Sequence, residues 1–172
     1  GLYRDEGFGC GWSRVEQTGL PRGRVVSLVA RADGNIDALI ASASGGQNLY
    51  ISRDHGQSWS PLTAALPVMQ AFDLAHASAE PLRSYLLGVK SGSSNATLWV
   101  SQDGGETWAE RPALDTLCTH ILAVDASEAR RVFLRCAGDT MERVLVSTDD
   151  GEHFTHFIEV PEIAGLAVSP DG

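Results

Sequence analysis

The chain contains 172 residues, with 22 acidic and 13 basic side chains and a formal net charge of −9 at pH 7. Nucleic acids and anionic membrane surfaces favour basic patches, so this balance argues against both as partners. No apolar run approaches the roughly 18 residues that a membrane-spanning helix needs, so we expect no membrane insertion, and the length suits a single domain.

The first 16 residues predict a partial unit of two short strands, one around Leu2-Tyr3 and one from Trp12 to Glu16. Asp5 and Gly7 lie between them. Asp side chains accept hydrogen bonds from nearby backbone amides, and Gly adopts a positive φ at no steric cost, so both residues favour a tight turn.

A complete unit follows over about residues 25–60. Ser27 to Ala30 is small and apolar and predicts a crowded inner strand, and Ala38 to Ser42 predicts a second strand. Leu49 to Ile51 predicts a third strand, which leads into the phrase SRDHGQSW at residues 52–59. An outer strand after this phrase completes four strands.

The same order recurs over about residues 71–110 and 119–158, with the phrases SQDGGETW at 101–108 and STDDGEHF at 147–154. Self-similarity at about 50 residues indicates a row of repeated supersecondary units. A last apolar segment, 163–168, predicts the inner strand of a further unit. No sustained helical period occurs, and Pro61 and Pro67 favour a loop over a helical turn between them.

Each phrase places turn-forming residues and an aromatic residue at fixed offsets. The Asp and Ser side chains satisfy backbone amides, the Gly supplies a positive φ, and the aromatic ring covers the turn. A single carboxylate per turn is too few for calcium, which takes six or more oxygens, so we predict a structural role. The positions are Ser52, Asp54, Gly56 and Trp59; Ser101, Asp103, Gly105, Thr107 and Trp108; Ser147, Asp149, Gly151 and Phe154; and, in a weaker first copy, Asp5, Gly7 and Trp12.

The pattern S-x-D-x-G-x-T-W at this spacing resembles the Asp-box, or BNR, repeat. The third copy departs from it at His153 and Phe154, and the first copy lacks the Ser. The resemblance implies an all-β propeller of four-stranded antiparallel blades, with each box between the third and fourth strands, away from the substrate face. Sialidases, xyloglucanase-type glycosidases, sortilin-type receptors and photosystem assembly factors share such boxes, so the resemblance specifies the fold better than the function.

Three complete blades and two partial ones do not make a usual ring. Propellers typically need about four to eight blades, and an open arc leaves unpaired strand edges. We therefore expect this chain to form part of a six- to eight-bladed ring, closed by missing sequence, a second copy or a partner chain.

The cysteines indicate the cellular compartment in which the protein folds. Cys118 and Cys136 flank a predicted hairpin and come nearly opposite each other, which favours a disulfide over two buried thiols and hence an oxidising compartment. Cys10 is left over. We expect a secreted, periplasmic or cell-surface protein.

Catalytic residues are hard to assign. Resemblance to sialidases implies three substrate-binding arginines, the first of them in an Arg-Ile-Pro phrase, and this chain has no such phrase. Arg83 and Arg131 begin second strands and are expected on the face opposite the usual pocket. Arg24 is then the only arginine in a suitable position for this role. A glycosidase needs paired carboxylates. The available acids, Asp73, Asp115 and Asp139, show no pairing, and the histidines show no metal spacing. We predict no catalytic, cofactor-binding or metal-binding residue.

The sequence therefore favours a noncatalytic propeller module that binds a protein or a glycan ligand or acts as a scaffold. The loop 88–95, with Gly45-Gly46 and Gly138-Asp139, is where we expect ligand contact. The alternatives are part of a secreted glycoside hydrolase, sialidase-like or xyloglucanase-like, with its catalytic residues mostly outside this chain, and an assembly factor of the photosystem type.

Overall fold

The computed structural model describes residues 3–5, 11–14, 19–62 and 65–169. These residues form β-strands and loops, and no helix occurs among them, so the described part has no helix able to cross a membrane. A pair of strands, β1 (Tyr3–Asp5) and β2 (Trp12–Arg14), precedes three antiparallel four-stranded sheets. The all-β architecture predicted from the sequence is confirmed.

Each sheet keeps its strands in chain order. The first contains β3 (Gly23–Ala30), β4 (Ile36–Ser42), β5 (Gln47–Ser52) and β6 (Ser60–Pro61). The second contains β7 (Gln70–His76), β8 (Ser84–Val89), β9 (Thr97–Ser101) and β10 (Ala109–Glu110). The third contains β11 (Cys118–Val124), β12 (Val132–Ala137), β13 (Glu142–Ser147) and β14 (Thr155–Val160).

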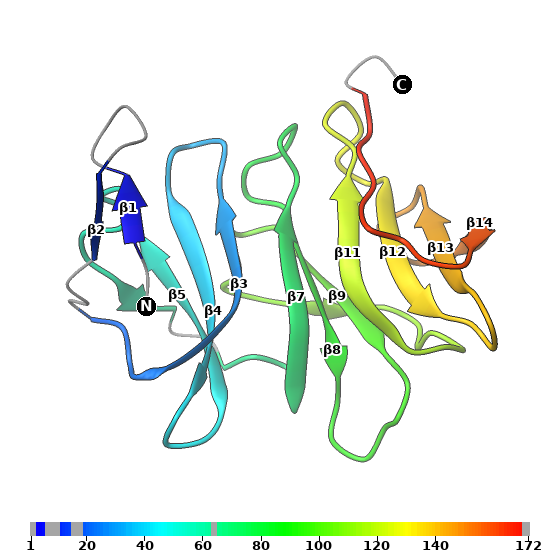
Figure 1. Ribbon diagram of the computed structural model, residues 1–172, viewed down its shortest axis with the longest axis horizontal. Coiled ribbons are helices and arrows are strands. Elements are labelled where there is room, and N and C mark those ends of the chain that lie inside the picture. Colours follow the sequence, from blue (N-terminus) through cyan, green and yellow to red (C-terminus); the bar gives the residue numbers. More distant parts are fainter. Residues whose placement is uncertain (1–2, 6–10, 15–18, 63–64, 170–172) are drawn as a thin grey trace.

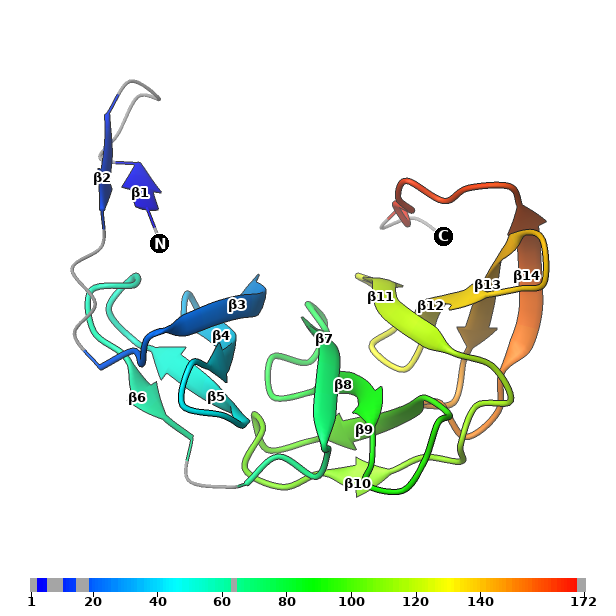
Figure 2. The ribbon, with the colours of Figure 1, turned by 60° about the horizontal axis from the view of Figure 1, so that its bottom comes forward.

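The sheets are fanned along an arc, in the manner of propeller blades (Figures 1 and 2). The inner strands β3, β7 and β11 line the concave side, and β7 contacts both of the others. Strands β6, β10 and β14 lie toward the outside of the arc. The concave side is therefore built from the small, apolar segments that the sequence places first in each unit.

The core lies between neighbouring sheets. Leu39 and Leu49 of the first sheet pack with Leu86 and Trp99 of the second. A separate cluster joins the second sheet to the third, with Leu87 and Leu98 on one side and Leu134 on the other; all are fully buried. Trp99 is 1% exposed and belongs to the core. Burying both faces of a sheet against its neighbours explains why the middle sheet has the most continuous apolar strands.

Every inner strand contains a β-bulge at the same place. The register shifts between Val25 and Ser27 in β3, between Ala71 and Asp73 in β7, and between Cys118 and His120 in β11. A bulge bends its strand and re-aims the side chain that follows it. Ser27, Asp73 and His120 consequently occupy equivalent positions on three adjacent strands.

The segment 163–168 differs from the prediction, because it forms no strand. Ile163, Leu166 and Val168 pack instead against Phe133 and Val144, on the face of the third sheet that lies away from the second. A strand requires a hydrogen-bonded neighbour, and no following strand of the described chain offers one. Ile163 is buried, so the apolar side chains of the segment contact the sheet although its backbone pairs with no strand. The predicted loop between Pro61 and Gln70 has no helix among its described residues.

Candidate functional site

The first two acidic turns, between β5 and β6 and between β9 and β10, are built by one set of hydrogen bonds. The Ser52 hydroxyl donates to Asp54 Oδ1 over 2.8 Å and accepts the Gly56 N–H over 2.8 Å. Ser101 makes the same two bonds, to Asp103 Oδ1 and from Gly105 N, both at 2.8 Å. Each Asp accepts two further bonds from the residue four positions on, whose N–H donates to Oδ1 and whose hydroxyl donates to Oδ2.

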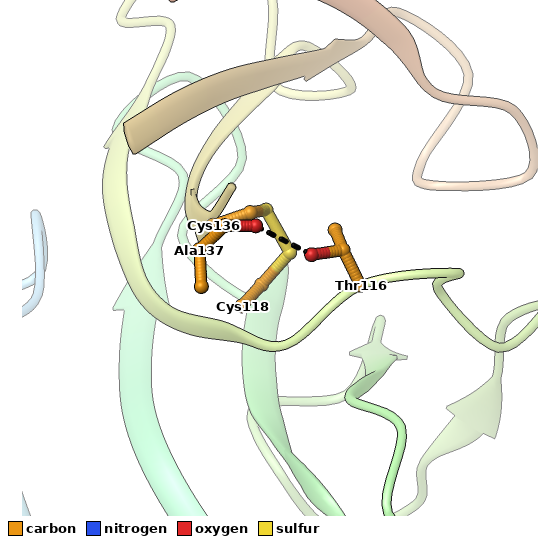
Figure 3. Close-up of a disulfide and its surroundings, with 4 residues drawn as sticks. All are labelled: Thr116, Cys118, Cys136 and Ala137. Carbon is orange, nitrogen blue, oxygen red and sulfur yellow. Dashed lines mark hydrogen bonds between the residues drawn. A yellow bond between two sulfur atoms is a disulfide. The ribbon is translucent and has the colours of Figure 1, made fainter. Parts of the chain in front are cut away.

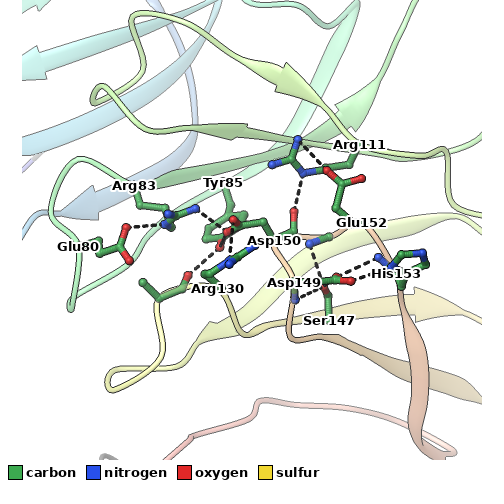
Figure 4. Close-up of polar contacts among 12 residues, drawn as sticks. Glu80, Arg83, Tyr85, Arg111, Arg130, Ser147, Asp149, Asp150, Glu152 and His153 are labelled. Atoms are coloured by element: carbon green, nitrogen blue, oxygen red, sulfur yellow. Dashed lines mark hydrogen bonds and ion pairs between the residues drawn. The ribbon is translucent and has the colours of Figure 1, made fainter.

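The third turn, between β13 and β14, keeps this geometry with a different donor. Ser147 and Gly151 repeat the bonds of the other boxes. His153 donates its backbone N–H to Asp149 Oδ1 over 3.0 Å, and its Nδ1 lies 2.7 Å from Oδ2 (Figure 4). The imidazole therefore replaces the Ser or Thr hydroxyl, which explains how the box tolerates the change.

These bonds favour the ionised carboxylates. Side-chain and backbone donation from Ser58 lowers the pKa of Asp54 from 3.8 to about 2, and donation from Thr107 does the same for Asp103. His153 holds the pKa of Asp149 well below its usual range, and the carboxylate in turn raises the pKa of His153. The lone pairs of these acids are occupied by the turn itself, which supports a structural role.

The box glycines pack against the aromatic residues of their own turns. Gly56, Gly105 and Gly151 all have positive φ. A Cβ at each would contact the aromatic ring three residues on, at 3.4 to 3.9 Å. At Gly151 it would also lie 2.7 Å from Leu98 of the second sheet, so only glycine allows the turn to approach its neighbour this closely. In the weak first copy, Asp5 and Trp12 pair within the β1–β2 ladder, and Gly7, like Cys10, lies outside the described residues.

A buried polar cluster ties the third box to the second sheet (Figure 4). Asp150, the residue between Asp149 and Gly151, is 3% exposed and has φ of 63°. Its Oδ1 lies 2.6 Å from Arg83 Nη1 and 2.7 Å from the Tyr85 hydroxyl, and its Oδ2 lies 3.1 Å from Arg130 Nε. Arg111 Nε donates to the Asp150 carbonyl over 2.8 Å. Burial raises the pKa of Tyr85, so it stays a neutral donor.

A second cluster joins the first sheet to the second. Arg31 donates Nε and Nη2 to Asp37 Oδ2, and Nη2 also donates to the carbonyl of Gly104 in the second box. His76 Nε2 lies 2.8 Å from the same carboxylate oxygen. Both inter-sheet contacts therefore use an arginine from the turn after an inner strand to hold the box of the following blade.

Asp73 ties the three inner strands together. Its Oδ1 accepts from the Ser27 hydroxyl of β3 and from Leu74 N, both over 2.9 Å, and its Oδ2 accepts from Ile121 N of β11 over 3.0 Å. His120 Nδ1 lies 3.7 Å from Oδ2. The sequence predicted Asp73 on an inner strand but gave no sign of these partners, because the bulges that align the strands are invisible in the residue pattern.

The other residues considered for chemistry are scattered. Arg83 is committed to Asp150, and Arg131 pairs with Asp125 and Glu128. Arg24, Asp115 and Asp139 are exposed and have no hydrogen-bond partner among the described residues. Within the same residues, no group of three or more His, Cys, Asp or Glu side chains could hold a metal ion.

Cys118 and Cys136 form a disulfide between the start of β11 and the end of β12, where the two residues are direct register partners (Figure 3). Thr116 lies beside it and donates its hydroxyl to the Ala137 carbonyl over 2.6 Å. This bridge fixes the connection 111–117 to the third sheet.

That connection covers one side of a cavity of about 620 Å³ on the third sheet. The cavity is lined by Pro112, Ala113, Leu114, Asp115, Thr116, Arg143, Leu145, Gly151, Glu152, Phe154, His156 and Glu159. A smaller hollow of about 310 Å³ lies beside the Gly45-Gly46 hairpin of the first sheet. The cavity on the third sheet was not predicted, because the connection 112–116 and residues 143–159 meet only in the folded structure.

Comparison with known proteins agrees with this geometry. The family model described as BNR/Asp-box repeat matches residues 50–61 and 99–110, which contain the first two boxes. The third box, outside both matches, forms the same bonds. No curated protein matches the chain in sequence.

Solved structures of similar fold include a GH74 enzyme from Niastella koreensis, with a TM-score of 0.59 and 19% identity, covering 82% of this chain and 22% of that one. YCF48 bound to a D1 peptide matches with a TM-score of 0.54 and 15% identity, covering 81% of this chain and 42% of that one. An α-L-arabinofuranosidase, Arb93A from Fusarium graminearum, matches with a TM-score of 0.57 and 13% identity, covering 84% of this chain and 52% of that one. The chain spans about a fifth to a half of these proteins, and the likeness shows the fold alone.

Proposed function

Since the chain carries Asp-box repeats on sheets arranged as propeller blades, we propose that it acts as a noncatalytic binding or scaffolding module outside the cytoplasm. The observation that carries this proposal is that the Asp73 carboxylate is fully used in hydrogen bonds within the protein. This acid occupies the inner strand of the middle blade, and hydrogen bonds from Ser27, Leu74 and Ile121 occupy both of its oxygens. A general acid or nucleophile needs a carboxyl group that can reach a substrate.

The box acids support the same proposal. Asp54, Asp103 and Asp149 each accept bonds from their own turn, so their lone pairs satisfy backbone and side-chain donors. The other two candidate acids, Asp115 and Asp139, lie in different connections, one before β11 and one between β12 and β13. Neither the box acids nor the pair Asp115 and Asp139 supplies the facing carboxylates of a glycosidase.

A glycoside hydrolase fragment is the second candidate. The GH74 enzyme and the α-L-arabinofuranosidase among the similar structures favour it, and the catalytic acids would then belong to blades beyond this chain. The photosystem-type assembly factor is the third, favoured by the similarity to YCF48. A basic or arginine-lined channel would support that role, and the inner-strand row here consists of Ser27, Asp73 and His120.

We infer that further blades complete the ring. Phe157 and Ile158 of β14 are 56% and 45% exposed, and β1 and β2 have no further strands beside them in the described chain. Missing sequence, a second copy or a partner chain would supply these blades. The disulfide between Cys118 and Cys136 supports an oxidising compartment, hence a secreted, periplasmic or cell-surface location.

Turnover assays test the noncatalytic role. The protein is incubated with β-glucan, xyloglucan, arabinan and a sialoside, and released sugars are measured beside Asp73→Asn and Arg24→Ala variants. We expect no product from any of the three proteins. Release of sugar by the wild type that either substitution abolishes would overturn the proposal and favour the hydrolase.

A further inference from the structure

The cavity on the third sheet lies at a position where the side chains of two blades differ. Leu145 pairs with Leu134 in the third sheet as Trp99 pairs with Leu86 in the second, so the two residues are equivalent. Trp99 is 1% exposed and belongs, with Leu62, to a buried cluster against which Leu66 and Val68 pack. Leu145 is much smaller than an indole, and the space above it stays open under the connection 112–116.

The walls of the cavity combine an apolar base with a polar rim. Leu114, Leu145 and Phe154 belong to the cluster between the second and third sheets. The rim carries Asp115, Glu152 and Glu159 beside Arg143 and His156. Its volume of about 620 Å³ lies within the range of about 300–1,000 Å³ usual for small-molecule sites.

The rim charges restrict the ligand. Arg143 Nε and Glu159 Oε1 are 3.1 Å apart, so a strong donor and a strong acceptor are presented together. The side chains of Asp115 and His156 have no hydrogen-bond partner among the described residues, and both residues are exposed. Glu159 pairs with Arg143 and Glu152 with Arg111, so Asp115 is the carboxylate of this rim that has no counter-ion in the described chain, and it disfavours an anionic ligand. A neutral ligand with neighbouring hydroxyls can donate to the acids and accept from Arg143 at once.

We propose that this cavity is a binding site for a neutral saccharide unit. The C–H face of the sugar ring packs on Leu145 and Phe154, and its hydroxyls bond Asp115, Arg143 and Glu159. The inference rests on the proposed function, because it gives the binding module a ligand class and a place. The site lies between the 112–116 connection and strands β13 and β14, whereas the concave side is lined by other strands, β3, β7 and β11.

The test is an NMR titration of the protein with three neutral oligosaccharides, cellotetraose, xylotetraose and arabinotetraose, and with two charged ones, trigalacturonate and triglucosamine. We expect amide shifts at residues 112–116 and 156–159 with a neutral sugar, and weaker binding of both charged sugars. Leu145→Trp restores the residue that fills this space in the second sheet, and it should weaken binding at least about tenfold. Asp115→Asn, at an exposed position, should also weaken binding.

Ile158→Trp is the matched control, because Ile158 lies on β14 and pairs with Val144, whose side chain packs on the opposite face of the sheet. This variant should keep the wild-type affinity. Absence of shifts with all neutral sugars, stronger binding of a charged sugar, or equal binding by Leu145→Trp would overturn the inference. Product formation in the same samples would instead contradict the proposed noncatalytic role, so the two failures are distinguishable.

Discussion

Arg83 and Asp150, 67 residues apart in the chain, meet in a buried ion pair with Arg83 Nη1 2.6 Å from Asp150 Oδ1. Asp150 is the variable residue of the third box, and its backbone has a positive φ like that of His55 and Gly104 at the same position of the other boxes. The pair thus joins the box of one blade to the turn before the second strand of the preceding blade. It shows that the boxes stabilise contacts between blades as well as the turns themselves.

Breaking this pair should lower the stability of the whole arc. Arg83→Met leaves the Asp150 carboxylate buried with Arg130 as its remaining cation, and removing one partner of a buried pair costs about 3 kcal/mol or more. The free energy of unfolding by urea measures the loss. Arg22→Met, at an exposed arginine, is the control and should change little. Equal stability of the two variants would show that the pair contributes nothing.

Acid should destabilise the protein through its box carboxylates. The folded pKa of Asp54 and Asp103 is about 2, below the ordinary value of 3.8, so their contribution is complete above about pH 4 and is lost as the pH falls toward 2. Unfolding free energies measured from pH 5 to pH 2 should decline over this window. Asp103→Asn should show a shallower decline, and an unchanged slope in that variant would contradict the assignment.

The third box should also lose stability as the pH rises. The pKa of His153 is raised in the folded state by Asp149, so its contribution is complete below the ordinary pKa of 6.5 and is lost as the pH rises through the folded value. His153→Thr, which copies Thr107 of the second box, should remove this component of the pH dependence. NMR titration of the imidazole gives the folded pKa directly, and a value at or below 6.5 would refute the pairing.

Reduction of the disulfide should destabilise the third sheet. The bridge joins residues 18 apart, and closing a loop of this size is worth about 3 kcal/mol. Unfolding with and without a reductant should therefore differ for the wild type. The Cys118→Ser, Cys136→Ser double variant should match the reduced wild type and show no response to reductant. Identical curves for oxidised and reduced protein would contradict the bridge.

The sequence predicted the parts of the fold that depend on local chemistry. The Ser, Asp and Gly of each box specify their turn within eight residues, and the apolar segments between boxes specify four strands per unit. His153 differed from the usual residue, yet its Nδ1 can take the place of a hydroxyl, so the turn survives. Contacts that depend on how blades sit together were not predictable in this way.

Arg83, Asp150 and Asp73 illustrate the limit. Arg83 was expected on the face opposite the usual pocket, but nothing in the residue pattern indicates that the variable position of the third box would be its partner. The role of Asp73 depends on bulges in three strands, which are set by packing of the inner strands rather than by turn residues. The segment 163–168 was predicted as a strand from its apolar residues alone, while pairing also needs a neighbouring strand.

The central claim is that the acidic turns clamp the hairpins and perform no chemistry. Its most direct test is the unfolding free energy of Ser101→Ala, because Ser101 is 1% exposed and its hydroxyl links Asp103 to Gly105 N. Loss of this hydroxyl leaves the buried Gly105 N–H without its partner, which should cost about 1–3 kcal/mol, whereas Ser91→Ala at an exposed position should cost almost nothing. Equal stability of both variants would contradict the claim.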